Sequence, residues 1–228
     1  MLHVRPFDTL GHFDNEWLHA RYHFSFADYH DAARMGLGKL RVWNDDLIEA
    51  GTGFPPHSHR DMEIITYIRE GAITHEDSLG NRGRTEAGQV QVMSAGTGIQ
   101  HAESNQEAGP TRLFQIWIVP SQHGLPPRWE TRPFPRQHGR LQVLASGLGD
   151  EGAAVIHQEA RVLGATLDAG DRITHRIDGR SAYLVPARGS LTVNGMEVAE
   201  RSGVVIEGEA EITVIATRDA EVVMVETA

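Results

Sequence analysis

Short apolar runs, separated from one another by glycine, proline, asparagine or aspartate, dominate the 228-residue chain. Their length and their β-branched residues are typical of strands, and no long stretch has the apolar period of a helix. Asn194-Gly195 lies between two such runs and predicts a two-residue hairpin, because both turn positions need a positive φ. The spacing predicts an all-β sandwich or barrel. The clearest predicted strands are residues 39–43, 63–68, 90–93, 113–119, 141–144, 182–185, 191–193, 204–206, 211–217 and 221–225.

Two stretches of the chain resemble each other and indicate an internal duplication. The run from Tyr67 to Thr74 resembles residues 183–192, which begin Tyr183-Leu184-Val185. Each run is followed by a glycine that precedes an apolar strand, Gly88 in the first case and Gly203 in the second. We interpret the two stretches as copies of one barrel.

The segment between the two copies is rich in proline. Residues 120–137 contain five prolines. Because proline has no N–H to donate to a sheet ladder, this composition predicts a connector rather than a core strand. We therefore expect a first barrel domain over residues 1–120, a Pro-rich connector over 121–137 and a second barrel domain over 138–228.

The amino-acid composition restricts the metal ligands and the binding partners that the protein can have. The chain has no cysteine, so any metal must be held by imidazole and carboxylate groups. A formal net charge of −10, without a basic run, makes direct contact with nucleic acid unfavourable. The apolar stretches are too short to span a bilayer, and the N-terminus lacks the apolar region of a signal peptide. We expect a cytoplasmic protein that does not bind membranes.

Two pairs of polar residues carry the candidate chemistry. His57 and His59 are two positions apart in a predicted strand, so both imidazoles point to the same side. His101 and Glu103 repeat this spacing after a glycine-rich stretch. Two strands that each supply two inward ligands can surround one ion inside a barrel. Such ligands suit Fe(II), Mn, Ni, Cu and Zn, and Fe(II) is the ion we expect.

A simpler interpretation is that these histidines are ordinary polar positions on exposed strands. The chain contains 13 histidines, so a chance His-x-His pair is not rare. The second pair and the glycines that precede it favour the metal site.

The same residues resemble the motifs of the cupin superfamily and, more narrowly, the pirin family in its bacterial quercetinase-like branch. The resemblance is dense from Arg21 to Pro120 and thinner in the C-terminal half. It implies two tandem cupin barrels of the jelly-roll type, with the metal in the first. The matching segments are residues 23–29, 35–36, 40–46, 57–64, 75–81, 93–99, 101–105 and 115–117.

Two departures from the family pattern affect the ligand set. Pirins often have proline between the first two histidines, where this chain has Ser58. Ser58 is expected on the opposite strand face, so ligation should survive. The general cupin pattern takes its fourth ligand from the position of Glu63, whereas pirins use the position of Glu103. We follow the pirin pattern: the expected metal ligands are His57, His59, His101 and Glu103, and Glu63 is structural.

The second copy lacks the ligand pairs. Aligning Tyr67 with Tyr183 places His175 opposite His59, and aligning Gly71 with Gly189 places it opposite His57. Either alignment leaves one imidazole, and no later His-x-Glu follows. We expect a metal-free second barrel and interpret His175 as a polar surface residue, along with His123, His138 and His157.

The resemblance implies quercetin 2,3-dioxygenase activity, in which O2 opens the heterocyclic ring of a flavonol and carbon monoxide is released. A metal would lower the pKa of the flavonol 3-hydroxyl, and Glu103 is the candidate general base that takes its proton. The residues alone do not select flavonol over another enolisable aromatic.

The alternative function is non-enzymatic. Some pirins are associated with transcriptional regulators, so the protein could sense metal or redox state and bind a protein partner. A sugar-isomerase type of cupin fits the pirin-specific motifs less well.

Overall fold

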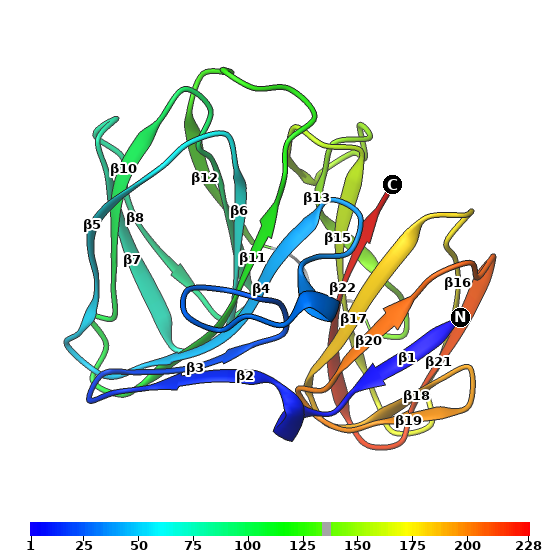
Figure 1. Ribbon diagram of the computed structural model, residues 1–228. Coiled ribbons are helices and arrows are strands. Elements are labelled where there is room, and N and C mark those ends of the chain that lie inside the picture. Colours follow the sequence, from blue (N-terminus) through cyan, green and yellow to red (C-terminus); the bar gives the residue numbers. More distant parts are fainter. Residues whose placement is uncertain (134–137) are drawn as a thin grey trace.

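The computed structural model describes residues 1–133 and 138–228, and it contains two β-barrels that lie side by side (Figure 1). Residues 134–137 of the expected connector lie outside the described residues. Two short 3₁₀ helices, η1 (Phe7–Thr9) and η2 (Ala32–Arg34), lie in the N-terminal segment. In the described parts of the chain, no helix is long and apolar enough to cross a bilayer.

The first barrel is built from a large and a small antiparallel sheet. The seven-stranded sheet runs β12 (Arg128–Pro133), β9 (Gln89–Ser94), β6 (Glu63–Glu70), β11 (Thr111–Ile118), β4 (Leu40–Ile48), β3 (Leu18–Tyr22), β2 (Gly11–Asp14). The four-stranded sheet runs β5 (Gly53–His59), β10 (Ile99–Ser104), β7 (Ala72–Asp77), β8 (Arg82–Glu86).

The second barrel has two corresponding sheets, and all of their strand pairs are antiparallel except β13 with β14, which is parallel. Its seven-stranded sheet runs β1 (Leu2–Arg5), β20 (Gly203–Ile206), β17 (Ser181–Arg188), β22 (Ala220–Thr227), β15 (Ala160–Leu167), β13 (Gln142–Ser146), β14 (Ala154–Val155). Its four-stranded sheet runs β16 (Arg172–Arg176), β21 (Glu211–Ala216), β18 (Leu191–Val193), β19 (Met196–Val198).

The matching strand orders bear out the duplication predicted from sequence. In the first barrel β6 lies between β9 and β11, and in the second β17 lies between β20 and β22. Tyr67 on β6 and Tyr183 on β17 are both buried, as the alignment of the two copies requires. The predicted all-β fold of two cupin barrels is therefore confirmed.

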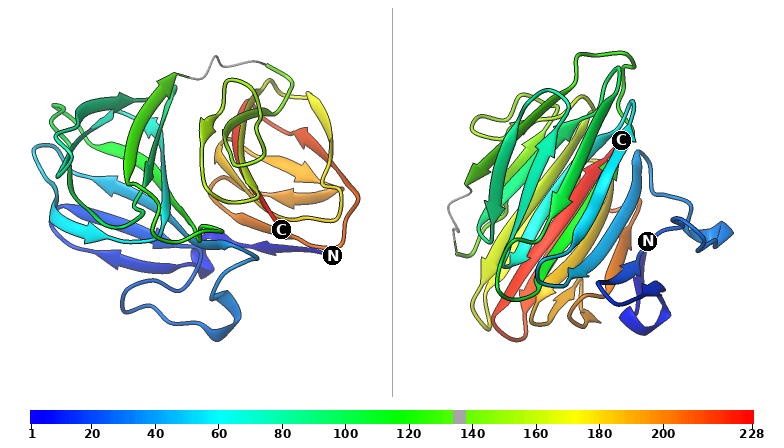
Figure 2. Two further views of the ribbon diagram at one scale, coloured as in Figure 1. Left: turned by 90° about the horizontal axis from the view of Figure 1, so that it is seen from above. Right: turned by 90° about the vertical axis from the view of Figure 1, so that its left-hand side faces the viewer.

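The structure differs from the expected domain division in two places. β1, from the extreme N-terminus, pairs with β20 of the second barrel rather than with the rest of residues 1–120. Figure 2 shows this blue segment reaching the orange strands of that barrel. Within the expected connector, β12 pairs with β9 of the first barrel. The prolines do not prevent this, because β12 is an edge strand and Pro133 is its last residue. Each large sheet thus has an edge strand from outside the residue range expected for its domain: β1 in the second barrel and β12 in the first.

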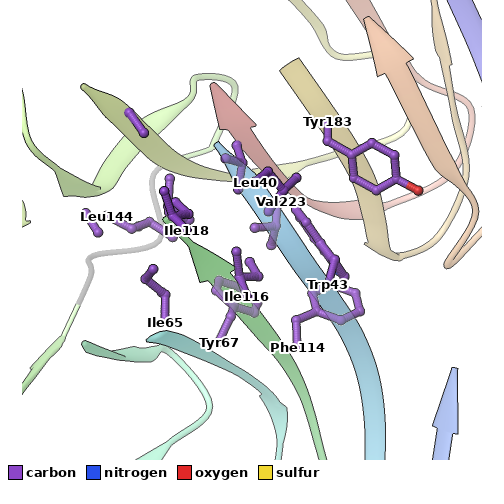
Figure 3. Packing of buried hydrophobic residues seen from close by; sticks show 14 of the residues in the cluster. Leu40, Trp43, Ile65, Tyr67, Phe114, Ile116, Ile118, Leu144, Tyr183 and Val223 are labelled. Atoms are coloured by element: carbon purple, nitrogen blue, oxygen red, sulfur yellow. The ribbon is translucent and has the colours of Figure 1, made fainter. Parts of the chain in front are cut away.

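The two seven-stranded sheets pack against each other through a shared apolar core. Figure 3 shows Trp43 from β4 with Phe114 from β11, and Tyr183 from the opposing β17. The ring centroids of Trp43 and Tyr183 are 5.6 Å apart. Trp43, Phe114 and Tyr183 are all fully buried. The side chains that alternate with these core residues on β6, β9 and β11 face the interior of the first barrel, and they include the polar residues Thr66, Gln91 and Gln115.

Candidate metal centre

Strands β5 and β10 bring the predicted histidines together. Their antiparallel register places His57 opposite His101 and His59 opposite Ile99. The ring centroids of His57 and His59 lie 4.4 Å and 5.0 Å from that of His101. One nitrogen from each of the three rings lies within 4.8 Å of the others. Ser58 between them is exposed, as expected from strand alternation.

The hydrogen bonds of the rings leave one nitrogen of His57 and one of His101 for a ligand. Nδ1 of His57 lies 2.8 Å from the carbonyl oxygen of Pro55, which can only accept, so Nδ1 carries the proton and Nε2 has the lone pair. Nδ1 of His101 lies 3.4 Å from Nδ1 of His75. Nε2 of His101 is buried and has no hydrogen-bond partner. A buried nitrogen left bare beside two more imidazoles fits a metal ligand.

The environment keeps the imidazoles of His59 and His101 uncharged. Burial, followed by the neighbouring His101 and His57, lowers the pKa of His59 from 6.5 to about 4. Burial, followed by His57 and His75, lowers the pKa of His101 from 6.5 to about 3. The neutral ring is the form that binds a metal, so near neutral pH neither ring needs to lose a proton first.

Glu103 lies next to His101 and is more deeply buried than His57 and His59. A bulge between His101 and Glu103 shifts the pairing of β10 with β5. Glu103 is 1% exposed, and its donor atoms group with His101 and a further histidine, His75, rather than with His57 and His59. The carboxylate accepts hydrogen bonds from Nε2 of Gln91 (2.7 Å) and Nε2 of Gln115 (2.8 Å).

Glu63 lies in another environment. Its carboxyl group is buried and accepts a 2.7 Å hydrogen bond from the Ser94 hydroxyl. Burial raises the pKa of Glu63, although hydrogen bonds from Ser94 and from the backbone of His157 act against that rise. It is absent from both groups of candidate ligands among the described residues. This position suits the structural role expected for Glu63.

Three polar residues of the site were not identified from the sequence. Gln91 on β9 and Gln115 on β11 show no ligand spacing, and only the closed barrel brings their amides to Glu103. His75 lies on β7 beside β10, and its signal was a His-x-Asp pair with Asp77 at the same spacing as the ligand pairs. His75 and Gln115 both lie in segments that resemble the family motifs, but that resemblance assigns neither of them to the site.

Aromatic rings flank the half-buried histidines. Trp117 packs edge-on against His59 with ring centroids 4.9 Å apart, and Phe54 lies 6.3 Å from His57. Phe54 and Trp117 are partly exposed. A flat aromatic molecule that approached the histidines would meet the apolar surface of these two rings.

The equivalent strand of the second barrel is apolar. Where β10 points His101 and Glu103 inward, β21 points Ile212, Val214 and Ala216 into a hydrophobic core. His175 on β16 differs from the expected surface residue: its side chain is 23% exposed and pairs with the buried Glu226. His123 and His138 are exposed, as expected, whereas His157 is partly buried.

Comparison with known proteins places the chain in a family. The pirin family model matches residues 3–118, and a model described as the quercetinase C-terminal cupin domain matches residues 143–227. A Pseudomonas aeruginosa protein provisionally named a quercetin 2,3-dioxygenase is 57% identical, with both chains covered completely. The quercetin 2,3-dioxygenase of Escherichia coli K12 is 39% identical over 98% of this chain and 97% of its own.

A solved structure shows the same fold. The Escherichia coli bacterial pirin YhhW in complex with nickel(II) superimposes with a TM-score of 0.95 at 38% identity, covering 100% of this chain and 99% of that one. With a family model over half of the chain and full-length relatives of this similarity, the chain belongs to the pirin family.

Proposed function

We propose that the protein is a metal-dependent dioxygenase that opens the heterocyclic ring of flavonols such as quercetin with O2 and releases carbon monoxide. The observation that carries the proposal is the bare, buried Nε2 of His101, whose ring lies beside those of His57 and His59 and also groups with the Glu103 carboxylate. The names of the relatives supply the substrate class.

His57, His59 and His101 would hold one divalent ion, with Glu103 as the fourth ligand and Fe(II) as the expected metal. A bound ion of this kind acidifies a coordinated hydroxyl group and gives O2 a redox partner. Three neutral imidazoles add no charge of their own, so the carboxylate is the only anion among these four ligands.

The chain's own contribution to proton transfer is Glu103. The two glutamine amides hold both carboxylate oxygens, and each oxygen keeps a second lone pair that can accept a proton. Glu103 would take the proton of the flavonol 3-hydroxyl as the general base. Phe54 and Trp117 would pack against the flat rings of the substrate.

Protein purified without chelators tests the proposal. Elemental analysis should find one metal ion per chain, since the inward positions of β21 are apolar. With quercetin in air, the metal-loaded protein should consume O2, bleach the flavonol absorption band and release carbon monoxide, and it should do none of these without O2. If the fully loaded protein binds flavonols but consumes no O2 with any of a panel, the non-enzymatic sensor becomes the better account.

A further inference from the structure

Asp77, at the end of β7, accepts hydrogen bonds on both carboxylate oxygens. The backbone N–H groups of Leu79 (2.9 Å) and Asn81 (3.1 Å) donate to Oδ1, and the side-chain amide of Asn81 donates to Oδ2 (2.9 Å). Nε2 of His75 lies 2.9 Å from the same Oδ2. Because a carboxylate can only accept, Nε2 of His75 carries a proton.

That assignment fixes the proton on the next ring. A neutral His75 with a protonated Nε2 has its lone pair on Nδ1, which faces Nδ1 of His101 at 3.4 Å. Two lone pairs cannot share this contact, so Nδ1 of His101 carries the proton and Nε2 of His101 is bare. We propose that His75, held by Asp77, is a positioning residue that fixes His101 in its metal-binding tautomer. The inference rests on the metal centre proposed above.

The surroundings of His75 prevent it from turning. His75 is fully buried, and its ring stacks on Trp129 with centroids 4.9 Å apart and planes 9° apart. The side chain of Asp77 is 0% exposed. Ligating histidines commonly donate their second N–H to a fixed acceptor, which aligns the ring. Here the acceptor is another histidine.

The same proton selects between two groups of donors. Besides the triad with His57 and His59, His101 belongs to an inner group with His75 and Glu103. Nδ1 of His101 is the nitrogen that lies beside His75. Once it carries a proton it cannot bind an ion together with His75, and Nε2 remains to bind one with His57, His59 and the proposed fourth ligand Glu103.

Asp77→Asn should reverse the positions of the ring protons on His75 and His101. Oδ1 of residue 77 faces two backbone N–H groups, so the new amide NH2 takes the Oδ2 position, where it faces His75 and displaces the side-chain amide of Asn81. His75 would then accept at Nε2 and donate from Nδ1, which moves the proton of His101 to Nε2 and blocks the metal. We expect the metal affinity to fall by roughly 10–100-fold. Glu76→Gln is the matched control, because it makes the same change one residue away on an exposed face.

Two substitutions of His75 separate hydrogen bonding from packing. His75→Phe keeps a ring that can stack on Trp129 but removes both nitrogens, and the affinity should fall by a similar factor. His75→Gln has an amide oxygen that can accept from His101 and an NH2 that can donate to Asp77, so it should recover most of the affinity. A purely structural role predicts the opposite order, with Phe closer to wild type.

The measurement uses the apoprotein titrated with Zn(II), with affinity from calorimetry and the His101 tautomer from long-range ¹H–¹⁵N NMR. Wild type and Glu76→Gln should show a protonated Nδ1 and a zinc-bound Nε2 on His101.

Wild-type affinity in both Asp77→Asn and His75→Phe would overturn the inference, as would a wild-type His101 that binds zinc through Nδ1. If His75→Phe does not fold, the zinc affinities of Asp77→Asn and His75→Gln still test whether His75 positions His101. A wild type that binds no zinc at these histidines contradicts the metal centre itself, whereas zinc binding without O2 consumption contradicts only the dioxygenase.

Discussion

At the scale of single residues, the first barrel buries polar side chains on the strands that carry the candidate ligands. His101 and Glu103 are each at most 2% exposed, and each has named partners: His75 for the ring, Gln91 and Gln115 for the carboxylate. Buried polar groups are stable only when they are paired or bind a ligand. The unpaired Nε2 of His101 is therefore the atom on which the residue-level predictions depend.

His57→Ala, His59→Ala and His101→Ala should each strip the metal or weaken its binding severely. Each change removes one ligand, whereas the barrel keeps its apolar core and should remain folded. Elemental analysis and circular dichroism check the two statements. Glu63→Gln is the control that should retain the metal, since Glu63 bonds to Ser94 away from the histidines. Loss of metal in Glu63→Gln, with Glu103→Gln intact, would mean that the general cupin ligand pattern applies.

Glu103→Gln should separate the proposed role of Glu103 as a metal ligand from its proposed role as the general base. The new carbonyl oxygen can still reach an ion, but the amide cannot take a proton, so turnover should fall by roughly 10²–10⁴-fold. The new NH2 also faces an amide donor, either Gln91 or Gln115, and the lost hydrogen bond should cost about 1–3 kcal/mol of stability. Metal content, turnover and unfolding free energy must be measured on one preparation. Wild-type turnover in this variant would exclude Glu103 as the base.

At the scale of elements, the edge strand β12, which belongs to the predicted connector, packs against the candidate site of the first barrel. It pairs with β9 along six residues and carries Trp129 onto His75. The indole also lies over β8, where Gly83 leaves room for it: a Cβ at Gly83 would come within 2.2 Å of the Trp129 ring. A strand from the predicted connector thus packs against His75, the neighbour of His101.

Gly83→Ala should displace Trp129 and loosen β12. Overpacking of this kind costs about 1–3 kcal/mol, because the indole or the strand must shift. Intrinsic tryptophan fluorescence and the unfolding free energy report the change, and metal affinity should fall as the His75 ring loses its support. Gly109→Ala is a suitable control, since nothing lies within 4 Å of its Cβ position. Equal stability of the two variants would argue against the proposed role of β12.

At the scale of the whole molecule, the two barrels are joined by one apolar core and by buried polar contacts across it. His23, from the N-terminal segment, is fully buried, and its Nδ1 lies 2.9 Å from the Tyr183 hydroxyl of the second barrel. Burial, followed by the charges of Arg5, Arg201, Arg34 and Arg69, lowers the pKa of His23 from 6.5 to about 3. Protonation in the folded state is therefore strongly disfavoured.

This shift predicts an acid-sensitive interface. As the pH falls below 6.5, the unfolded chain takes up a proton on His23 that the folded chain does not accept until about pH 3. The stabilising effect of the neutral ring is complete above pH 6.5 and is lost as the pH falls through this window, at up to ~1.4 kcal/mol per pH unit. Asparagine can keep the bond to Tyr183 without titrating, so His23→Asn should have a shallower pH dependence. Denaturant unfolding from pH 7 to 4.5 compares the slopes, and equal slopes would contradict the prediction.

The sequence by itself determined the features that depend on neighbours along the chain. The lengths of the apolar runs gave an all-β fold, because strand formation follows short local patterns. The two pairs with i, i+2 spacing, His57 with His59 and His101 with Glu103, named candidate ligands, because alternate residues of a strand share a face. The resemblance of Tyr67 and Tyr183 segments identified the duplication.

Only the tertiary structure decided which distant residues meet. It assigned β1 to the second barrel and β12 to the first, since edge strands pair wherever an open sheet edge and a buried face are available. It also brought Gln91, Gln115 and His75 to the site and joined His23 to Tyr183 across 160 positions. These contacts follow from barrel closure and from the need to pair buried polar groups. Neither requirement produces a periodic pattern of residues along the sequence.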